Sequence, residues 1–206
     1  MIFRNLQKVW HYLKCVIILN QEIGIHIKKK FDNFGDNSLL MKPFLQLTGC
    51  ENINIGCNTT ILSNARLSVY GNSDEDIIII GNNCYISFGF SVLASSKAKI
   101  TIGNEVLIAS NVLITNENHG IDIESNVPYM YQDLVASDVV IGNGCWIGEN
   151  VCILPGVFIG EKCIVGAGAV VTKSIPSYSI AVGNPARVIK TYNFDVGGWV
   201  KNDENG

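Results

Sequence analysis

Residues 141–171 read IGNGCWIGENVCILPGVFIGEKCIVGAGAVV, and an aliphatic residue recurs there at every sixth position. Extended back by one unit, this column consists of Val135, Ile141, Ile147, Ile153, Ile159, Val165 and Val171. Four positions after each member comes another apolar residue, in the order Val139, Cys145, Val151, Val157, Cys163, Ala169 and Ile175. A period of six fits neither an α-helix nor an alternating strand, so each unit is predicted to be one short strand and one corner.

The same unit occurs earlier in the chain, in a shifted phase. Its aliphatic positions are Ile55, Ile61 and Leu67, then Ile80, Ile86 and Val92, then Ile102, Ile108 and Ile114. Three units close one triangular coil, and residues added at corners such as Gly71–Asp76 and Ser95–Lys99 shift the phase. Glycine usually follows the aliphatic residue, where we expect it to help the chain turn. The pattern predicts an all-β parallel β-helix of five stacked coils, a prism roughly 24 Å long.

We expect three parts in the chain. Residues 1–51 are predicted to hold an amphipathic N-terminal helix and a cap, residues 52–190 the β-helix, and residues 191–206 a short C-terminal tail. The apolar face of the helix consists of Ile2, Phe3, Leu6, Val9, Trp10, Leu13, Val16 and Ile17. This helix either packs on the coil stack or a partner subunit, or lies on a membrane surface through its basic polar face.

Composition excludes some classes of function. With a net charge of -3 and no basic stripe after Lys30, the chain has no field for holding nucleic acid. The seven cysteines form no C-x-x-C pair, and Cys84, Cys145 and Cys163 fall on inward positions, so we interpret them as apolar fillers in a reducing compartment. The longest apolar run near the N-terminus has five residues and no cleavage site follows, which favours the cytoplasm.

The repeat is interrupted after Ile114 by the polar segment TNENHGIDIESNVPYMYQD, and Val135 is the next residue in phase, 21 positions on. We therefore predict a loop extruded from the prism at about residues 115–137. It contains His119, whereas His11 and His26, the other two histidines, lie far upstream. An imidazole titrates near neutral pH, so His119 is either a general base that deprotonates a hydroxyl or amine, or an exposed residue with no role.

No nucleophile motif accompanies this histidine. The chain has no G-x-S-x-G, and no cysteine lies near His119, so direct acyl transfer is simpler than a covalent intermediate. A three-histidine metal site would require His11 and His26 to converge on His119, so we expect no metal.

Residues 141–190, ending in VTKSIPSYSIAVGNPARVIK, resemble the hexapeptide-repeat acyltransferases nearly unit for unit. These are left-handed parallel β-helices that transfer acetyl groups from acetyl-CoA. The resemblance covers about residues 52–190 and is strongest to sugar O-acetyltransferases of capsule, O-antigen and exopolysaccharide gene clusters. It implies that His119, at the entry to the extruded loop, is the catalytic base, that acetyl-CoA is the co-substrate, and that the protein is a homotrimer with its acyl channels between neighbouring prisms.

The resemblance also implies which residues contact the cofactor. From the thiol end to the phosphate end, they are Trp146, Glu149, Ala167, Gly168, Thr172, Lys173, Arg187 and Lys190. Cationic side chains suit phosphate, and glycine or alanine corners let the pantetheine amides approach the backbone. The alternatives are corner packing for Trp146 and solvated charge for Lys173 and Arg187.

Candidate acceptor contacts are polar residues of the loop, namely Asn118, Asp122, Tyr129 and Tyr131. Galactoside-type members hold their acceptor with an asparagine one coil before the histidine, but Cys84–Phe90 has Gly89 near that place. The acceptor need therefore not be a simple galactoside.

We expect acetyl-CoA-dependent O-acetylation of a sugar hydroxyl on a polysaccharide unit. The alternatives are N-acetylation of an amino sugar, acetylation of serine or an antibiotic, and a structural β-helix without chemistry. The chain shows no similarity to the helical N-terminal domain of serine acetyltransferases, and a γ-type carbonic anhydrase would need three converging histidines.

Overall fold

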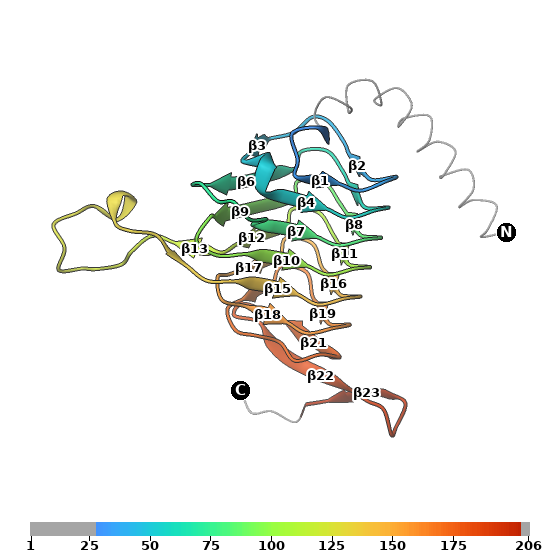
Figure 1. Cartoon of the computed structure of the whole chain (residues 1–206). Helices are drawn as coiled ribbons and strands as arrows, with labels where there is room; N and C mark the ends of the chain where they lie inside the picture. The colour runs from blue at the N-terminus through green and yellow to red at the C-terminus, as the bar shows by residue number, and fades with distance from the viewer. Residues whose placement is uncertain (1–27, 203–206) are drawn as a thin grey trace.

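The computed structural model describes residues 28–202, which form a parallel β-solenoid with three sheets as its sides (Figure 1). Sheet A stacks β1 (Asn33–Phe34), β4 (Ile53–Ile55), β7 (Ile78–Ile80), β10 (Ile100–Ile102), β15 (Val139–Ile141) and β18 (Phe158–Ile159). Sheet B stacks β2 (Leu39–Leu40), β5 (Thr60–Ile61), β8 (Tyr85–Ile86), β11 (Leu107–Ile108), β16 (Trp146–Ile147), β19 (Ile164–Val165) and β21 (Ser179–Val182), then the antiparallel β22 (Arg187–Asn193) and β23 (Gly198–Lys201). Sheet C stacks β3 (Gln46–Thr48), β6 (Arg66–Tyr70), β9 (Ser91–Ser95), β12 (Leu113–Thr115), β17 (Cys152–Ile153) and β20 (Val170–Val171). The described residues thus make six complete coils, one more than the sequence predicts.

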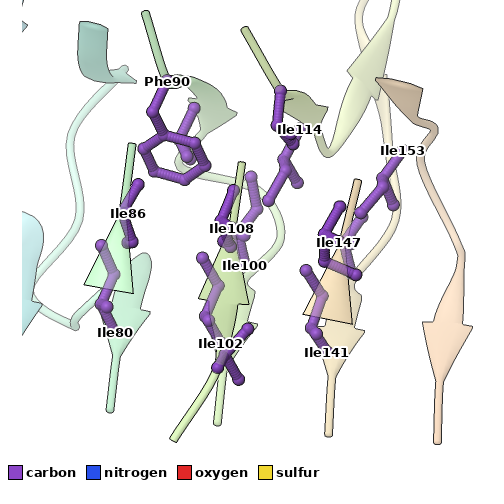
Figure 2. Packing of buried hydrophobic residues seen from close by; sticks show 14 of the residues in the cluster. Ile80, Ile86, Phe90, Ile100, Ile102, Ile108, Ile114, Ile141, Ile147 and Ile153 are labelled. Carbon is purple, nitrogen blue, oxygen red and sulfur yellow. The ribbon is translucent and has the colours of Figure 1, made fainter. Parts of the chain in front are cut away.

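The predicted aliphatic columns form the core. Each member from Ile55 to Val171 is at most 1% exposed, with the exception of Val135. Figure 2 shows how these side chains meet inside the prism, with Ile86, Ile108 and Ile147 in successive coils. The prediction is wrong for Val135, which is 63% exposed because it lies on β14 (Val135–Ala136), outside the stack.

The corners between sheets A and B have the same backbone conformation in every coil. A left-handed residue occurs at Asn37, Asn58, Asn83, Glu105, Gly144, Lys162 and Tyr178. The glycines after the aliphatic residues, which we expected to turn the chain, have no positive φ. They are needed for space instead, because a Cβ on Gly81 would lie 2.6 Å from the backbone carbon of Gly103 in the next coil.

Both ends of the stack differ from the predicted domain limits. The first coil begins at Asn33, inside the segment expected to be helix and cap, and its large side chains Phe34, Leu40 and Leu47 pack on the core. Residues 191–202 belong largely to β22 and β23, which pair antiparallel, so they are not a tail. The predicted helix at residues 1–19 and residues 203–206 lie outside the described residues. Between residues 28 and 202, no helix is long and apolar enough to cross a membrane.

Inserted residues collect at the third corner, between sheets C and A. There the chain adds the 3₁₀ helix η1 (Cys50–Asn52) and the segments 71–77 and 96–99. The longest insertion is a hairpin built on β13 (Glu117–Asn118) and β14, with η2 (Tyr129–Tyr131) in its loop. It projects away from the prism on the side opposite sheet B (Figure 1).

Close stacking at the corners gives a first prediction. Gly81→Ala should destabilise the fold by about 1–3 kcal/mol, because the new methyl group meets backbone atoms that cannot move independently. Gly198→Ala is the matched control, since a Cβ there meets no atom within 4 Å. Urea unfolding of both variants checks this, and equal stabilities would contradict the packing role of Gly81.

Candidate active site

A buried asparagine holds the root of the hairpin. Asn116 is 0% exposed, and its Oδ1 accepts a hydrogen bond from the backbone N–H of Ser95 at 2.8 Å. Its Nδ2 donates to the carbonyl oxygens of Ser95 and Ala98 at 3.1 and 2.7 Å. These bonds replace strand pairing where the chain leaves sheet C, and they fix the start of β13.

A glutamine holds the hairpin loop together. Gln132 Oε1 accepts from the backbone N–H of Asp122 at 2.9 Å, and Nε2 donates to the carbonyls of Asp122 and Val127 at 2.9 and 3.0 Å. Gly120 lies against this amide, because a Cβ there would be 2.9 Å from Gln132 Cβ. The loop after His119 is therefore ordered by its own contacts.

His119 directly follows β13. The side chain is exposed, and it makes no hydrogen bond to any residue in the range 28–202. Asp122 and Tyr131, two of the candidate acceptor contacts, line a hollow of about 370 Å³ together with Gly120 and Gln132. Asn118 and Tyr129 do not line this hollow. The loop thus brings two of the four acceptor candidates together in a hollow that His119 itself does not line.

Two of the candidate cofactor residues lie on one row of sheet B. Trp146 projects outward from β16 and is 51% exposed, between Leu107 and Ile164 of the adjacent strands. The row continues through Ile180 to Lys190 on β22. Arg187 lies on the same strand, exposed, and its Nη1 donates to the carbonyl of Ala186 at 2.9 Å.

The small-residue corner lies between sheets B and C. The backbone N–H of Gly168 donates to the carbonyl of Glu149 at 2.7 Å, so these corners stack in successive coils. Gly168 has a φ of +72°, and a Cβ there would meet no atom within 4 Å, so the corner is open to a ligand. Ala167 is also exposed.

Thr172 and Lys173 follow β20 and are exposed at the third corner, between sheets C and A. That is the corner from which the hairpin departs, two strands earlier in the stack. Within one chain, β13, which His119 directly follows, and β16, which carries Trp146, lie on different sides of the prism (Figure 1).

Three of the cysteines lie inside the prism. Cys84, Cys145 and Cys163 are buried, as the register predicts. Burial raises the pKa of the Cys84 thiol, and the hydrogen bond with Cys163 together with burial raises the pKa of Cys145. Among residues 28–202, no three His, Cys, Asp or Glu side chains are grouped so as to hold a metal ion. Cys15, His11 and His26 lie outside this range.

Comparison with known proteins agrees with the repeat and the fold. A family model described as bacterial transferase hexapeptide (six repeats) matches residues 138–173. The chain is 39% identical over 155 residues to the putative lipopolysaccharide biosynthesis O-acetyl transferase WbbJ of Escherichia coli K12, covering 72% of this chain and 76% of that protein. The chain belongs to the hexapeptide-repeat acyltransferase family.

Two further proteins are similar to this acyltransferase. The chain is 39% identical over 116 residues to galactoside O-acetyltransferase of the same organism, covering 56% of this chain and 55% of that protein. Among solved structures, a single-residue variant of the N-acyltransferase AntD from Bacillus cereus, in complex with dTDP-4-amino-4,6-dideoxyglucose and coenzyme A, superposes with a TM-score of 0.70. Its 24% identity, over 84% of this chain and 91% of AntD, shows a shared fold.

Sequence reasoning missed Asn116 and Gln132. Both are amides in a polar segment, and no spacing distinguishes them from their neighbours. The role of Asn116 depends on backbone groups of Ser95 and Ala98, which only the fold brings near, and the role of Gln132 depends on the path of the loop between Asp122 and Val127.

Asn116→Ala should destabilise the protein by roughly 1–3 kcal/mol, because it leaves the buried N–H of Ser95 and two carbonyls without this partner. Hydrogen exchange at β13 and β14 should also accelerate. Asn126→Ala, at an exposed position of the same hairpin, is the control and should change neither quantity. If both variants behaved alike, Asn116 would not be what anchors the hairpin.

Proposed function

We propose that this acyltransferase uses acetyl-CoA to O-acetylate a hydroxyl of a sugar in a polysaccharide unit or its precursor. The observation that carries the proposal is the hairpin that interrupts the prism and presents His119 directly after its first strand. The similarity to WbbJ and to galactoside O-acetyltransferase supports sugar as the acceptor class. Acetyl-CoA is a cytoplasmic metabolite, which supports the cytoplasm as the location of the enzyme.

His119 would act as the general base. It takes the proton of the acceptor hydroxyl while the oxygen attacks the thioester carbonyl. The tetrahedral intermediate then collapses, the C–S bond breaks, and the thiolate of CoA leaves and takes up a proton. An exposed imidazole that donates to no residue in the described range is free to bind the acceptor.

The cofactor would bind along the C-terminal coils. Lys173, Arg187 and Lys190 supply positive charge for its phosphates, whereas the stacked corners at Glu149, Ala167 and Gly168 offer backbone groups to pantetheine. Trp146 would lie near the thioester, and Thr172 beside the pyrophosphate.

We also propose a homotrimer in which His119 of one protomer faces the cofactor residues of its neighbour. The placement of β13, which His119 follows, and of β16, which carries Trp146, on different sides of one prism supports this assembly.

The acceptor hydroxyl would be held beside His119 by the hairpin. Asp122 and Tyr131 would contribute from the hollow of about 370 Å³ that they share, and Asn118 and Tyr129 from outside it. N-acetylation of an amino sugar is the second candidate, because the AntD complex with an amino sugar has the same fold. Paired glycosides that differ only in a hydroxyl or an amine would separate the two reactions.

His119→Ala should lower turnover by about 10²–10⁴-fold, because the base is lost, and should leave CoA binding and the thermal midpoint unchanged. Thiol release from acetyl-CoA, measured over a panel of sugars and nucleotide sugars, checks the rate. Glu124→Ala, exposed on the same hairpin, is the control and should retain turnover. Near-normal rates in His119→Ala would rule out the base mechanism.

Arg187→Ala should have the reverse effect. It should weaken CoA binding by about 10- to 100-fold, since a charge-assisted phosphate contact contributes roughly 1.5–3 kcal/mol. At saturating acetyl-CoA its turnover should be close to that of the wild type. Calorimetric titration with CoA, beside Lys162→Ala as an exposed control in the same coils, measures the effect. Unchanged affinity in Arg187→Ala would remove this residue from the cofactor site.

A further inference from the structure

Three polar side-chain atoms are buried without a hydrogen-bond partner among the described residues: Arg66 Nε, Ser68 Oγ and Glu117 Oε2. Ser68 as a whole is 0% exposed. Such groups are rare in native proteins and each costs free energy, so each demands an explanation. Arg66 and Ser68 lie on β6, and Glu117 lies on β13 at the root of the hairpin.

Strand register places Arg66 and Ser68 on the outer face of sheet C, whereas Glu117 lies on β13, which pairs with β14 outside that sheet. Leu67 and Val69 are buried in the core, so the alternate residues Arg66, Ser68 and Tyr70 project outward. Ser68 is paired with Leu93 on β9, and Leu93 with Thr115 on β12.

The last step of this row reaches Glu117. Its backbone N–H donates to Thr115 Oγ1 at 3.3 Å, which holds Glu117 beside the end of the row. The row from Ser68 to Thr115 crosses two strand spacings, about 10 Å. Polar atoms without partners therefore flank a single short stretch of the sheet.

A tyrosine covers the inner end of this stretch. Gln46 lies opposite Arg66 on β3, and its Nε2 donates to Tyr70 Oη at 3.1 Å. The Tyr70 ring must therefore extend along the strand, over the row that holds Ser68. Tyr70 is 41% exposed and its hydroxyl is held by this one bond, so a ligand can displace it or stack on it.

The donor and acceptor types define the ligand. Arg66 Nε donates, Glu117 Oε2 accepts, and the Ser68 hydroxyl does both. A ligand with several hydroxyls in fixed positions satisfies all three, because a hydroxyl also donates and accepts. An anion would suit Arg66 but meet the carboxylate of Glu117, and a cation would have the opposite problem.

We infer that the outer face of sheet C between β6 and β13 is an acceptor subsite that binds a neutral sugar through Arg66, Ser68 and Glu117. This inference rests on the proposed function, since Glu117 is two residues from the base His119. A sugar seated there is held by the rigid sheet, while the hairpin supplies the base.

The test is saturation-transfer NMR of the full-length protein with neutral methyl glycosides of glucose, galactose, mannose and rhamnose, and with methyl glucuronide as an anionic probe. At least one neutral glycoside should bind, and the glucuronide should bind less well. Ser68→Ala and Glu117→Gln should each weaken that binding at least about tenfold. Their thermal midpoints should stay unchanged or rise, because each removes an unpartnered buried polar atom or charge.

Thr101→Ala, half-buried on the outer face of sheet A, is the matched control and should bind the glycoside as the wild type does. No binding of any neutral glycoside, or wild-type binding by both variants, would overturn the inference. A fall in binding accompanied by a fall in the thermal midpoint would also overturn it, since it would mean a structural role.

Thiol release from acetyl-CoA separates the inference from the proposed function. If glycoside binding depends on Ser68 and Glu117 but no sugar releases thiol, the result supports the subsite and contradicts the proposed acetyl transfer. If a sugar releases thiol equally with the wild type, Ser68→Ala and Glu117→Gln, the transfer stands and the subsite falls.

Discussion

Backbone hydrogen bonds between successive coils bring the corners so close that no side chain fits between them, and the rest of the structure depends on this contact. The N–H of Gly81 donates to Ile102 at 2.8 Å, and the N–H of Gly103 donates to Ile141 at 2.8 Å. A Cβ at either glycine would overlap the next coil. The corners between sheets A and B consequently keep one length, and extra residues leave the prism at the corner between sheets C and A.

Where the chain leaves the prism at that corner it loses the hydrogen bonds of strand pairing. Side-chain amides make hydrogen bonds to the backbone there instead. The one side chain of Asn116 accepts a hydrogen bond from the N–H of Ser95 and donates to the carbonyl oxygens of Ser95 and Ala98. Gln132 does the same inside the loop. A hairpin fixed at its root and within its loop can hold His119 in one position, which a general base requires. The rigidity of the solenoid thereby extends to a segment outside it.

The sequence predicts the features of the structure that depend on the spacing of neighbouring residues, and it misses those that depend on contacts between distant segments. The sixfold columns predict the solenoid and its core, because they record one side chain per strand. The columns give a wrong prediction for Val135, since phase alone does not say whether a strand belongs to the stack. They also miss the first coil, because Phe34, Leu40 and Leu47 are spaced by six and then by seven residues. The antiparallel β22 and β23 have no period of six. His119 is singled out in the sequence by its isolation, whereas the proposed role of Ser68 rests on strand register and the role of Asn116 on hydrogen bonds to Ser95 and Ala98.

The position of the hairpin bears on assembly. A stack of coils cannot bend to bring Trp146 to His119, because each coil is bonded to both neighbours along its length. Ile121 and Ile123 are 85% and 86% exposed on the hairpin, and Trp146 and Leu107 form an exposed apolar stripe on sheet B. Apolar surface of this kind gains free energy when another surface covers it. A neighbouring copy that docks its hairpin on sheet B would cover both surfaces and complete the site in the same step.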